Sequence, residues 1–261
     1  MEVIILRDAN EIGVMGADAV AALLGRKPTA VVGLATGSSP LAIYDELIRR
    51  CDRGQVSFRQ ARGFTLDEYV GLTADHPQRY RNVIDEAFVS KVDFAPGAVQ
   101  GPDGLAADIP SACAEYEAVI RDAGGVDVQI LGIGTDGHIA FNEPGSSLGS
   151  RTRIKTLTRQ TRKDNARFFG GDVDGVPTHC LTQGLATILE ARHLILVATG
   201  QSKAEAVHQL VEGPVSALWP ATILQLHPHV TVLLDEAAAR RLQLVDYYRE
   251  THCSKPEWQG I

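Results

Sequence analysis

The chain has 261 residues, of which 44% are hydrophobic and 22% are charged. These proportions are typical of a globular protein and exclude a largely disordered chain. The formal net charge of −7 argues against a general nucleic-acid binder, because phosphate backbones require a basic surface.

The sequence also predicts where the protein resides. No apolar run approaches the roughly 18 residues of a membrane span, and the first residues, MEVIILRDANE, lack the basic and apolar blocks of a signal peptide. The four cysteines, Cys51, Cys113, Cys180 and Cys253, are scattered and form no C-x-x-C pair, so a zinc ribbon is not expected. We therefore expect a cytoplasmic protein with reduced thiols and no contact with membranes or nucleic acid.

Short apolar segments alternate with amphipathic ones along the whole chain. The apolar segments are nearly continuous rather than alternating, which is typical of strands buried on both faces. They are Val3–Leu6, Ala30–Ala35, Gly63–Leu66, Val126–Ile133, His193–Ala198 and Val230–Leu234. The amphipathic segments predict helices at Ala9–Leu24, Pro40–Arg50, Pro77–Phe88, Ile109–Arg121, Thr182–Leu189, Lys203–Val211 and Glu236–Tyr248.

This alternation predicts an α/β fold with an open, mostly parallel Rossmann-like sheet and helices on both faces. Composition stays even from end to end, so we expect residues 1–261 to form a single domain. Ligands of such sheets bind at the carboxyl ends of the strands. The loops after Ala35, Leu66, Ile133 and Ala198 are therefore the places to look for a site.

The loop after the second predicted strand, residues 36–39, has the features of an anion site. Gly37 lets the backbone approach a ligand, Ser39 is a favourable helix N-cap, and Pro40 suits the first helical position. Free N–H groups at a helix start carry partial positive charge and attract phosphate or carboxylate. The alternative is a well-capped turn that binds nothing.

Two adjacent acids, Asp67 and Glu68, follow the third predicted strand. Adjacent residues of an extended segment point to opposite faces, so at most one of them faces a site. That carboxylate is a candidate general base, and the other has a structural role; a helix cap or a surface acid is the alternative for either.

The segment Gly132–Gly137 matches the G-x-G-x-x-G pattern of dinucleotide sites. Such a site needs a helix start and an acid about 20 residues on, and neither is present here. The segment instead begins a loop that holds Asp136, His138 and Glu143. A carboxylate beside a histidine orients it for acid/base work near neutral pH. The three side chains are also possible cation ligands, although no fourth ligand is evident.

Together these loops resemble the glucosamine-6-phosphate deaminase family. The resemblance covers nearly the whole chain, and GHIAFNEP is its most specific part, favouring the deaminase branch over the related 6-phosphogluconolactonases. The matching stretches are LATGSSP (34–40), LDEYVGL (66–72), LGIGTDGHIAFNEPGSS (131–147), SRTRIKTLT (150–158) and GQSKA (200–204).

The resemblance implies an amino-sugar catabolic enzyme that converts glucosamine 6-phosphate to fructose 6-phosphate and ammonia, without a metal or organic cofactor. It implies that His138 opens the sugar ring with support from Asp136 and Glu143. Asp67 then moves the proton from C2 to C1. The role of Glu68 stays open.

The resemblance also implies a phosphate site made by Thr36, Gly37, Ser38, Ser39, Arg167 and Lys203. Arginine binds two phosphate oxygens at once, whereas lysine acts as a compact charge. Taken singly, Arg167 and Lys203 would be ordinary surface charges.

In the allosteric branch of the family, residues such as Ser146, Ser147, Arg153 and Lys155 bind N-acetylglucosamine 6-phosphate between subunits. Arg153 and Lys155 share one face of an extended segment. The family implies a homo-oligomer, often a hexamer. The alternative is that this basic pair only stabilises a subunit contact.

Two other functions fit parts of the pattern. One is a lactonase or another enzyme acting on a hexose phosphate. The other is a non-catalytic sugar-phosphate sensor, which should lack the acid/base residues that this chain keeps.

Overall fold

The computed structural model describes residues 1–256 and 258–261, and its main feature is a seven-stranded sheet whose neighbouring strands all run parallel. In spatial order the strands are β1 (Glu2–Leu6), β10 (Val230–Asp235), β9 (His193–Ala198), β6 (Val128–Leu131), β2 (Val31–Leu34), β3 (Arg62–Thr65) and β5 (Val99–Gln100). The predicted open parallel α/β sheet is confirmed, and all six predicted strands belong to it. The two-residue strand β5 was not predicted.

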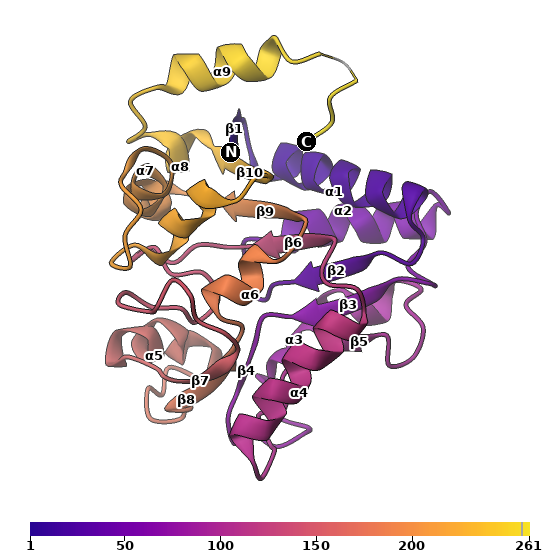
Figure 1. Ribbon diagram of the computed structural model, residues 1–261, viewed down its shortest axis with the longest axis vertical. Helices are drawn as coiled ribbons and strands as arrows, with labels where there is room; N and C mark the ends of the chain where they lie inside the picture. The colour runs from indigo at the N-terminus through magenta and orange to yellow at the C-terminus, as the bar shows by residue number, and fades with distance from the viewer. Residues whose placement is uncertain (257) are drawn as a thin grey trace.

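Helices cover both faces of this sheet (Figure 1). One face packs against α1 (Ala9–Arg26), α2 (Leu41–Asp52) and α3 (Tyr80–Ala87). The other packs against α4 (Ile109–Asp122), α6 (Leu185–Leu189), α7 (Ala204–Glu212) and α8 (Glu236–Ala239). Val31 and Val32 of β2 belong to the two opposite cores. Burial on both faces explains why the strands are continuously apolar.

A second, antiparallel sheet of order β4–β8–β7 was not predicted. Its strands are β4 (Asp67–Tyr69), β8 (His179–Thr182) and β7 (Arg153–Thr156), and α5 (Arg159–Asn165) follows β7. In Figure 1 this sheet and α5 lie toward one end of the molecule, and α9 (Val245–Cys253) lies at the other. The remaining elements are 3-10 turns, η1 (Val89–Lys91), η2 (Ala166–Phe168), η3 (Gln201–Lys203) and η4 (Pro220–Leu226).

The predicted helix Glu236–Tyr248 is wrong, because the structure has two helices there, α8 and α9. The carboxylate of Glu212 in α7 accepts hydrogen bonds from the backbone N–H groups of Gln243 and Leu244 at 2.9–3.0 Å. A carboxylate at this place satisfies the free donors of a new helix start. The interruption between α8 and α9 therefore depends on Glu212, a residue about thirty positions earlier in the chain.

Three other helix starts differ from the prediction. The helix predicted from Pro77 begins at Tyr80, and Thr182 ends a strand, so that α6 begins only at Leu185. Ser39 is not the N-cap of α2, because Pro40 holds that position and no side chain caps the helix.

No helix in the described ranges, 1–256 and 258–261, is long and apolar enough to cross a membrane. All four cysteines are free thiols.

The strand order changes direction beside β2. From β2 the chain continues to β3 and β5 on one side, and then crosses to β6 on the other side. The loops that follow β2 and β6 therefore lead to opposite sides, and in sheets of this type ligands bind at such a point, at the carboxyl ends of the strands.

Candidate active site

The loop after β2 lies at this change in strand order. The Tyr44 hydroxyl of α2 bonds the N–H and carbonyl of Ala35 at 3.0 and 2.9 Å, which fixes the end of the strand. Gly37 has a φ of +89°, a conformation that favours glycine. Ser39 lies so close to Gly132, at the end of β6, that a Cβ added there would be 3.2 Å from its Oγ. The predicted anion loop therefore borders the predicted catalytic loop.

The glycines of the loop after β6 make room for other side chains. A Cβ on Gly134 would lie 2.2–2.6 Å from the ring of His138, and one on Gly137 would lie 2.7 Å from the ring of Trp219. Gly137 also has a φ of +80°. This use of the glycines explains the G-x-G-x-x-G pattern without a dinucleotide.

Asp136 and His138 form a pair at the rim of this loop. His138 Nδ1 lies 2.6 Å from Oδ1 of Asp136, and the His138 backbone N–H donates to the same oxygen at 3.2 Å. Burial alone would raise the pKa of Asp136, but its bonds to His138 and the charge of that ring lower it. Asp136 therefore stays ionised beside the imidazole, as an orienting group must.

Glu143 is buried, but it contacts other partners. One carboxylate oxygen accepts hydrogen bonds from the hydroxyls of Thr158 and Thr161, and its distance to the Thr158 hydroxyl is 3.1 Å. Among the described residues it forms no hydrogen bond with His138 or Asp136. The structure thus pairs two of the three predicted residues and fixes the third to the start of α5.

Asp67 and Glu68 lie in β4, and the structure gives them separate surroundings. Asp67 is 7% exposed as a residue, and its carboxylate accepts no hydrogen bond from the described residues. Burial, and secondly the negative charge of Glu68, raise the pKa of Asp67 to about 8. Glu68 is bonded to three backbone N–H groups. The expectation that one acid is available and the other structural agrees with this geometry.

The two predicted phosphate cations lie in different segments, Arg167 in η2 and Lys203 in η3. Burial lowers the pKa of Lys203, Asp136 partly raises it, and the charge of Arg167 lowers it again. Lys203 is thus within electrostatic reach of both residues. Arg167 is exposed and its guanidinium lies 4.7 Å from the ring centre of Phe168.

The predicted effector residues lie in two places. Ser147 is exposed, whereas the Ser146 hydroxyl is buried without a hydrogen-bond partner among the described residues. Arg153 and Lys155 are half-buried on one face of β7, and Arg153 donates to the carbonyl of Arg151 at 3.2 Å. In the described structure neither serine bonds to this basic pair.

Sequence reasoning missed the residues that brace the site. The Thr182 hydroxyl accepts the Phe141 N–H at 3.1 Å, and Trp219 packs on Gly137. Thr158 caps α5 by accepting the N–H of Thr161. A threonine before a helical turn is a known cap signal, but the polar sequence of α5 has no apolar periodicity that would have drawn attention to it.

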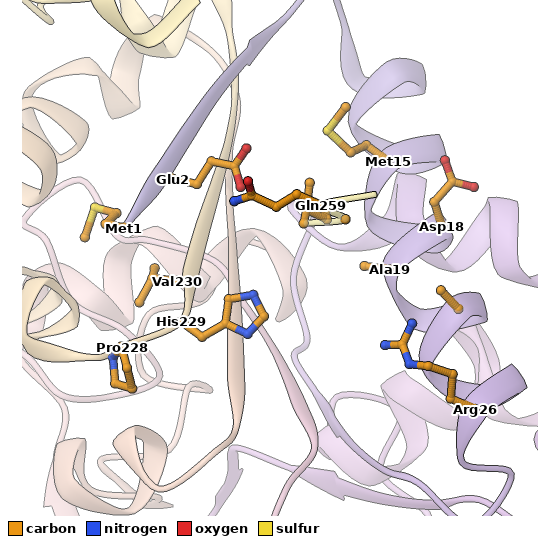
Figure 2. Close-up of a pocket in the computed structure, with 13 residues that line it drawn as sticks. Met1, Glu2, Met15, Asp18, Ala19, Arg26, Pro228, His229, Val230 and Gln259 are labelled. Carbon is orange, nitrogen blue, oxygen red and sulfur yellow. The ribbon is translucent and has the colours of Figure 1, made fainter. Parts of the chain in front are cut away.

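A cavity of about 790 Å³ lies away from these residues. Figure 2 shows its lining side chains, with α1 on one side, His229 and Val230 on the other, and Gln259 of the C-terminal tail between them. It borders the first residues of β1 and β10, at the amino ends of the strands. Because the polar loops gather at the carboxyl ends, we place the active site there.

Known proteins resemble this chain over its full length. Over all 261 residues and the whole of each relative, the chain is 80% identical to a protein named glucosamine-6-phosphate deaminase from Mycolicibacterium smegmatis and 70% identical to one from Beutenbergia cavernae.

Solved structures give the same relationship. A monomeric glucosamine-6-phosphate deaminase superposes with a TM-score of 0.89 at 42% identity, over 92% of this chain and 100% of that chain. The 6-phosphogluconolactonase from Trypanosoma cruzi shares the fold, with a TM-score of 0.74 at 20% identity over 93% and 97% of the two chains. Residues 9–233 match the family model for glucosamine-6-phosphate isomerases/6-phosphogluconolactonase, and the chain belongs to that family.

Proposed function

We propose that this protein is a glucosamine-6-phosphate deaminase, which converts glucosamine 6-phosphate to fructose 6-phosphate and ammonia. The observation that carries the proposal is the 80% identity, over the full length of both chains, to a relative with that name. The identity to the 6-phosphogluconolactonase from Trypanosoma cruzi is only 20%, which favours the deaminase over the lactonase.

In the proposed reaction Asp67 removes the proton from C2 of the open-chain sugar and returns it to C1. Its raised pKa, about 8, makes it a stronger base than an exposed aspartate. Because it accepts no hydrogen bond from the described residues, its oxygens are available to take the proton. The substrate's own nitrogen and carbonyl spread the charge that forms on carbon. The proton shift leaves an imine at C2, and a water molecule hydrolyses this imine, which breaks the C–N bond and releases ammonia and fructose 6-phosphate.

The proposed ring-opening group is His138, which transfers a proton between O1 and the ring oxygen. Asp136 orients the imidazole through the contact at 2.6 Å. Glu143 supports the site by holding the start of α5 through Thr158 and Thr161.

The proposed phosphate site combines the 36–39 loop with Lys203 and Arg167. The N–H groups before α2 supply partial positive charge, and the cations supply full charges. A bound phosphate would also favour the charged form of Lys203, which burial disfavours.

We further infer that the enzyme works in the cytoplasm as a homo-oligomer, and that N-acetylglucosamine 6-phosphate activates it. Exposed apolar side chains, such as Leu218 and Leu226 at 69% and 68% exposure, support association. The solved relative at 42% identity is described as monomeric. The mass of the protein in solution, measured by light scattering, distinguishes a monomer from an oligomer.

An assay of ammonia and fructose 6-phosphate release from glucosamine 6-phosphate tests the proposed activity. Galactosamine 6-phosphate and 6-phosphogluconolactone are the comparison substrates. Stoichiometric release of both products from the glucosamine substrate is expected. Hydrolysis of the lactone without ammonia release from either amino sugar would overturn the proposal.

A further inference from the structure

The carboxylate of Glu68 is buried where β4 meets α3. One oxygen accepts the N–H of Tyr69 at 2.8 Å and of Tyr80 at 2.9 Å, and the other accepts the N–H of Arg81 at 2.9 Å. The side chain of Glu68 is almost fully enclosed, at 2% exposure for the residue. A buried carboxylate is costly unless it is bonded in this way. Glu68 thus satisfies the first donors of α3, whose own N-cap, Arg79, makes no side-chain cap.

The contacts that Glu68 anchors return to the catalytic loop. Tyr80, the first residue of α3, lies parallel to Phe141 with ring centres 5.9 Å apart. The N–H of Phe141 donates to Thr182, and Thr182 is the register partner of Asp67. A closed circuit of contacts therefore runs from Asp67 through Glu68, α3 and the catalytic loop back to Asp67.

We propose that Glu68 is a positioning residue for the base Asp67, because its carboxylate fixes β4 against the first turn of α3 and places a negative charge beside the base. This inference deepens the proposed deaminase function and rests on it. Both carboxylate oxygens of Glu68 are already engaged by backbone N–H groups, so in this proposal Glu68 acts through its neighbour.

The charged and titratable groups around Asp67 identify Glu68 as the nearby anion. The groups that interact electrostatically with Asp67 are Glu68 and Tyr69 of β4, Tyr80 of α3, Tyr116 of α4 and Cys180 of β8. Arg153 of β7 lies in the same row of the small sheet as Asp67. Arg79, the N-cap of α3, forms an ion pair with Glu68. Burial raises the pKa of each tyrosine and of Cys180, so these stay neutral near pH 7. The negative charge that contributes to the raised pKa of Asp67 is therefore that of Glu68. Burial raises the pKa of Glu68 as well, whereas its three backbone N–H bonds and the charge of Arg79 favour its ionised form.

Two variants distinguish the effect of the Glu68 charge from the effect of its side-chain length. Glu68→Gln keeps the size and removes the charge, but its NH2 group cannot accept the hydrogen bond that one carboxylate oxygen accepts, so thermal stability should also fall. Because the negative charge is gone, we expect the acidic limb of the kcat–pH profile to move about one unit lower. We expect kcat to fall less than the roughly 100-fold loss that removal of a base causes, with KM little changed. Glu68→Asp keeps the charge but shortens the side chain, so the limb should stay in place while kcat and thermal stability fall.

A direct titration keeps the test independent of activity. In an NMR titration of protein labelled with ¹³C-aspartate, the carboxyl resonance that is missing from the Asp67→Asn variant is assigned to Asp67. The pH midpoint of this resonance should be lower in Glu68→Gln than in the parent, and should be unchanged in Glu68→Asp. An unchanged midpoint in a folded Glu68→Gln protein would overturn the proposal, whatever its stability. If the parent releases no ammonia from glucosamine 6-phosphate, the proposed function fails instead, and the titration still decides the part played by Glu68.

Discussion

Asp67 and Arg153 lie on the same face of the small sheet, two strands apart, with Thr182 directly between them in the register. Residues opposite one another in an antiparallel sheet share a face, so the row places the base about 10 Å from the backbone of a candidate effector residue. Lys155, Cys180 and Tyr69 form the next row on that face.

This relationship shows how close the candidate effector residues Arg153 and Lys155 lie to the strand of Asp67. The family resemblance implies that Arg153 and Lys155 bind an effector between subunits. In the structure only β8 separates the pair from Asp67. A displacement of β7 by a bound anion would therefore reach the strand of the base through one intervening strand.

Asp67→Asn should fold normally and lose most exchange of the C2 proton, because an amide cannot accept that proton. In the parent, activity should rise as the pH increases through about 8, since the base must be a carboxylate and its pKa is raised to that value. Deuterium incorporation from solvent measures the exchange. The exposed acid Asp85 supplies the control, Asp85→Asn, and near-parental incorporation in Asp67→Asn would reject Asp67 as the base.

His138→Gln should slow turnover of the closed-ring substrate more than turnover of an open-chain analogue. Only the closed form needs a proton transferred to its ring oxygen. The ratio of the two rates in parent and variant is the measurement. Equal slowing of both substrates would show that His138 merely positions the sugar.

Removal of either phosphate cation, in Arg167→Ala or Lys203→Ala, should weaken substrate binding. A desolvated charged hydrogen bond is worth about 1.5–3 kcal/mol, so KM should rise roughly tenfold to a hundredfold. Lys163→Ala, which removes an exposed cation from α5, is the control. An unchanged KM for the phosphorylated substrate would exclude the residue from the phosphate site.

N-acetylglucosamine 6-phosphate should lower the substrate concentration at half-saturation, through a coupling of about 1–3 kcal/mol. Arg153→Ala should abolish this shift while the rate at saturating substrate stays close to that of the parent. Initial rates with and without millimolar effector provide the measurement. Hyperbolic kinetics that the effector leaves unchanged in the parent would refute the effector site and not the catalytic one.

His193 should make the fold sensitive to acid. Burial, and then the charges of His229 and His227, lower the pKa of His193 to about 3, from 6.5 in the unfolded chain. The folded protein therefore binds fewer protons between these values, so this stability is complete above pH 6.5 and is lost as the pH falls toward 3.

The variant His193→Asn tests this assignment. Its free energy of unfolding should fall less steeply than that of the parent between pH 7 and pH 4, by up to about 1.4 kcal/mol per pH unit. The exposed His179 supplies the control, His179→Asn. Parallel pH profiles of parent and His193→Asn would contradict the assignment.

The large sheet could be predicted from sequence because its strands are buried on both faces and therefore read as continuous apolar runs. The family was also predicted correctly, from the motifs around Asp67 and His138. The small sheet could not be predicted in this way. β4 consists of Asp67, Glu68 and Tyr69, and β7 alternates the half-buried cations Arg153 and Lys155 with the exposed Ile154 and Thr156, so neither has the apolar pattern of the other strands.

Two of the errors at helix starts share one physical cause. Glu68 satisfies the start of α3 and Glu212 that of α9, and both carboxylates come from other elements. Ser39 has the right chemistry for a cap, yet the chain turns into α2 one residue later. Local patterns show which residues favour a helix, whereas these ends depend on tertiary contacts.

The pairing of β4 with β8 also bears on how the protein is made. More than a hundred residues separate Asp67 from its partner Thr182, so the ribosome exposes the base long before the strand that supports it. We expect a nascent chain that ends before β8 to hold the strands of the N-terminal half without an ordered base. Catalysis would then begin only after the segment of β8 has left the exit tunnel and paired with β4.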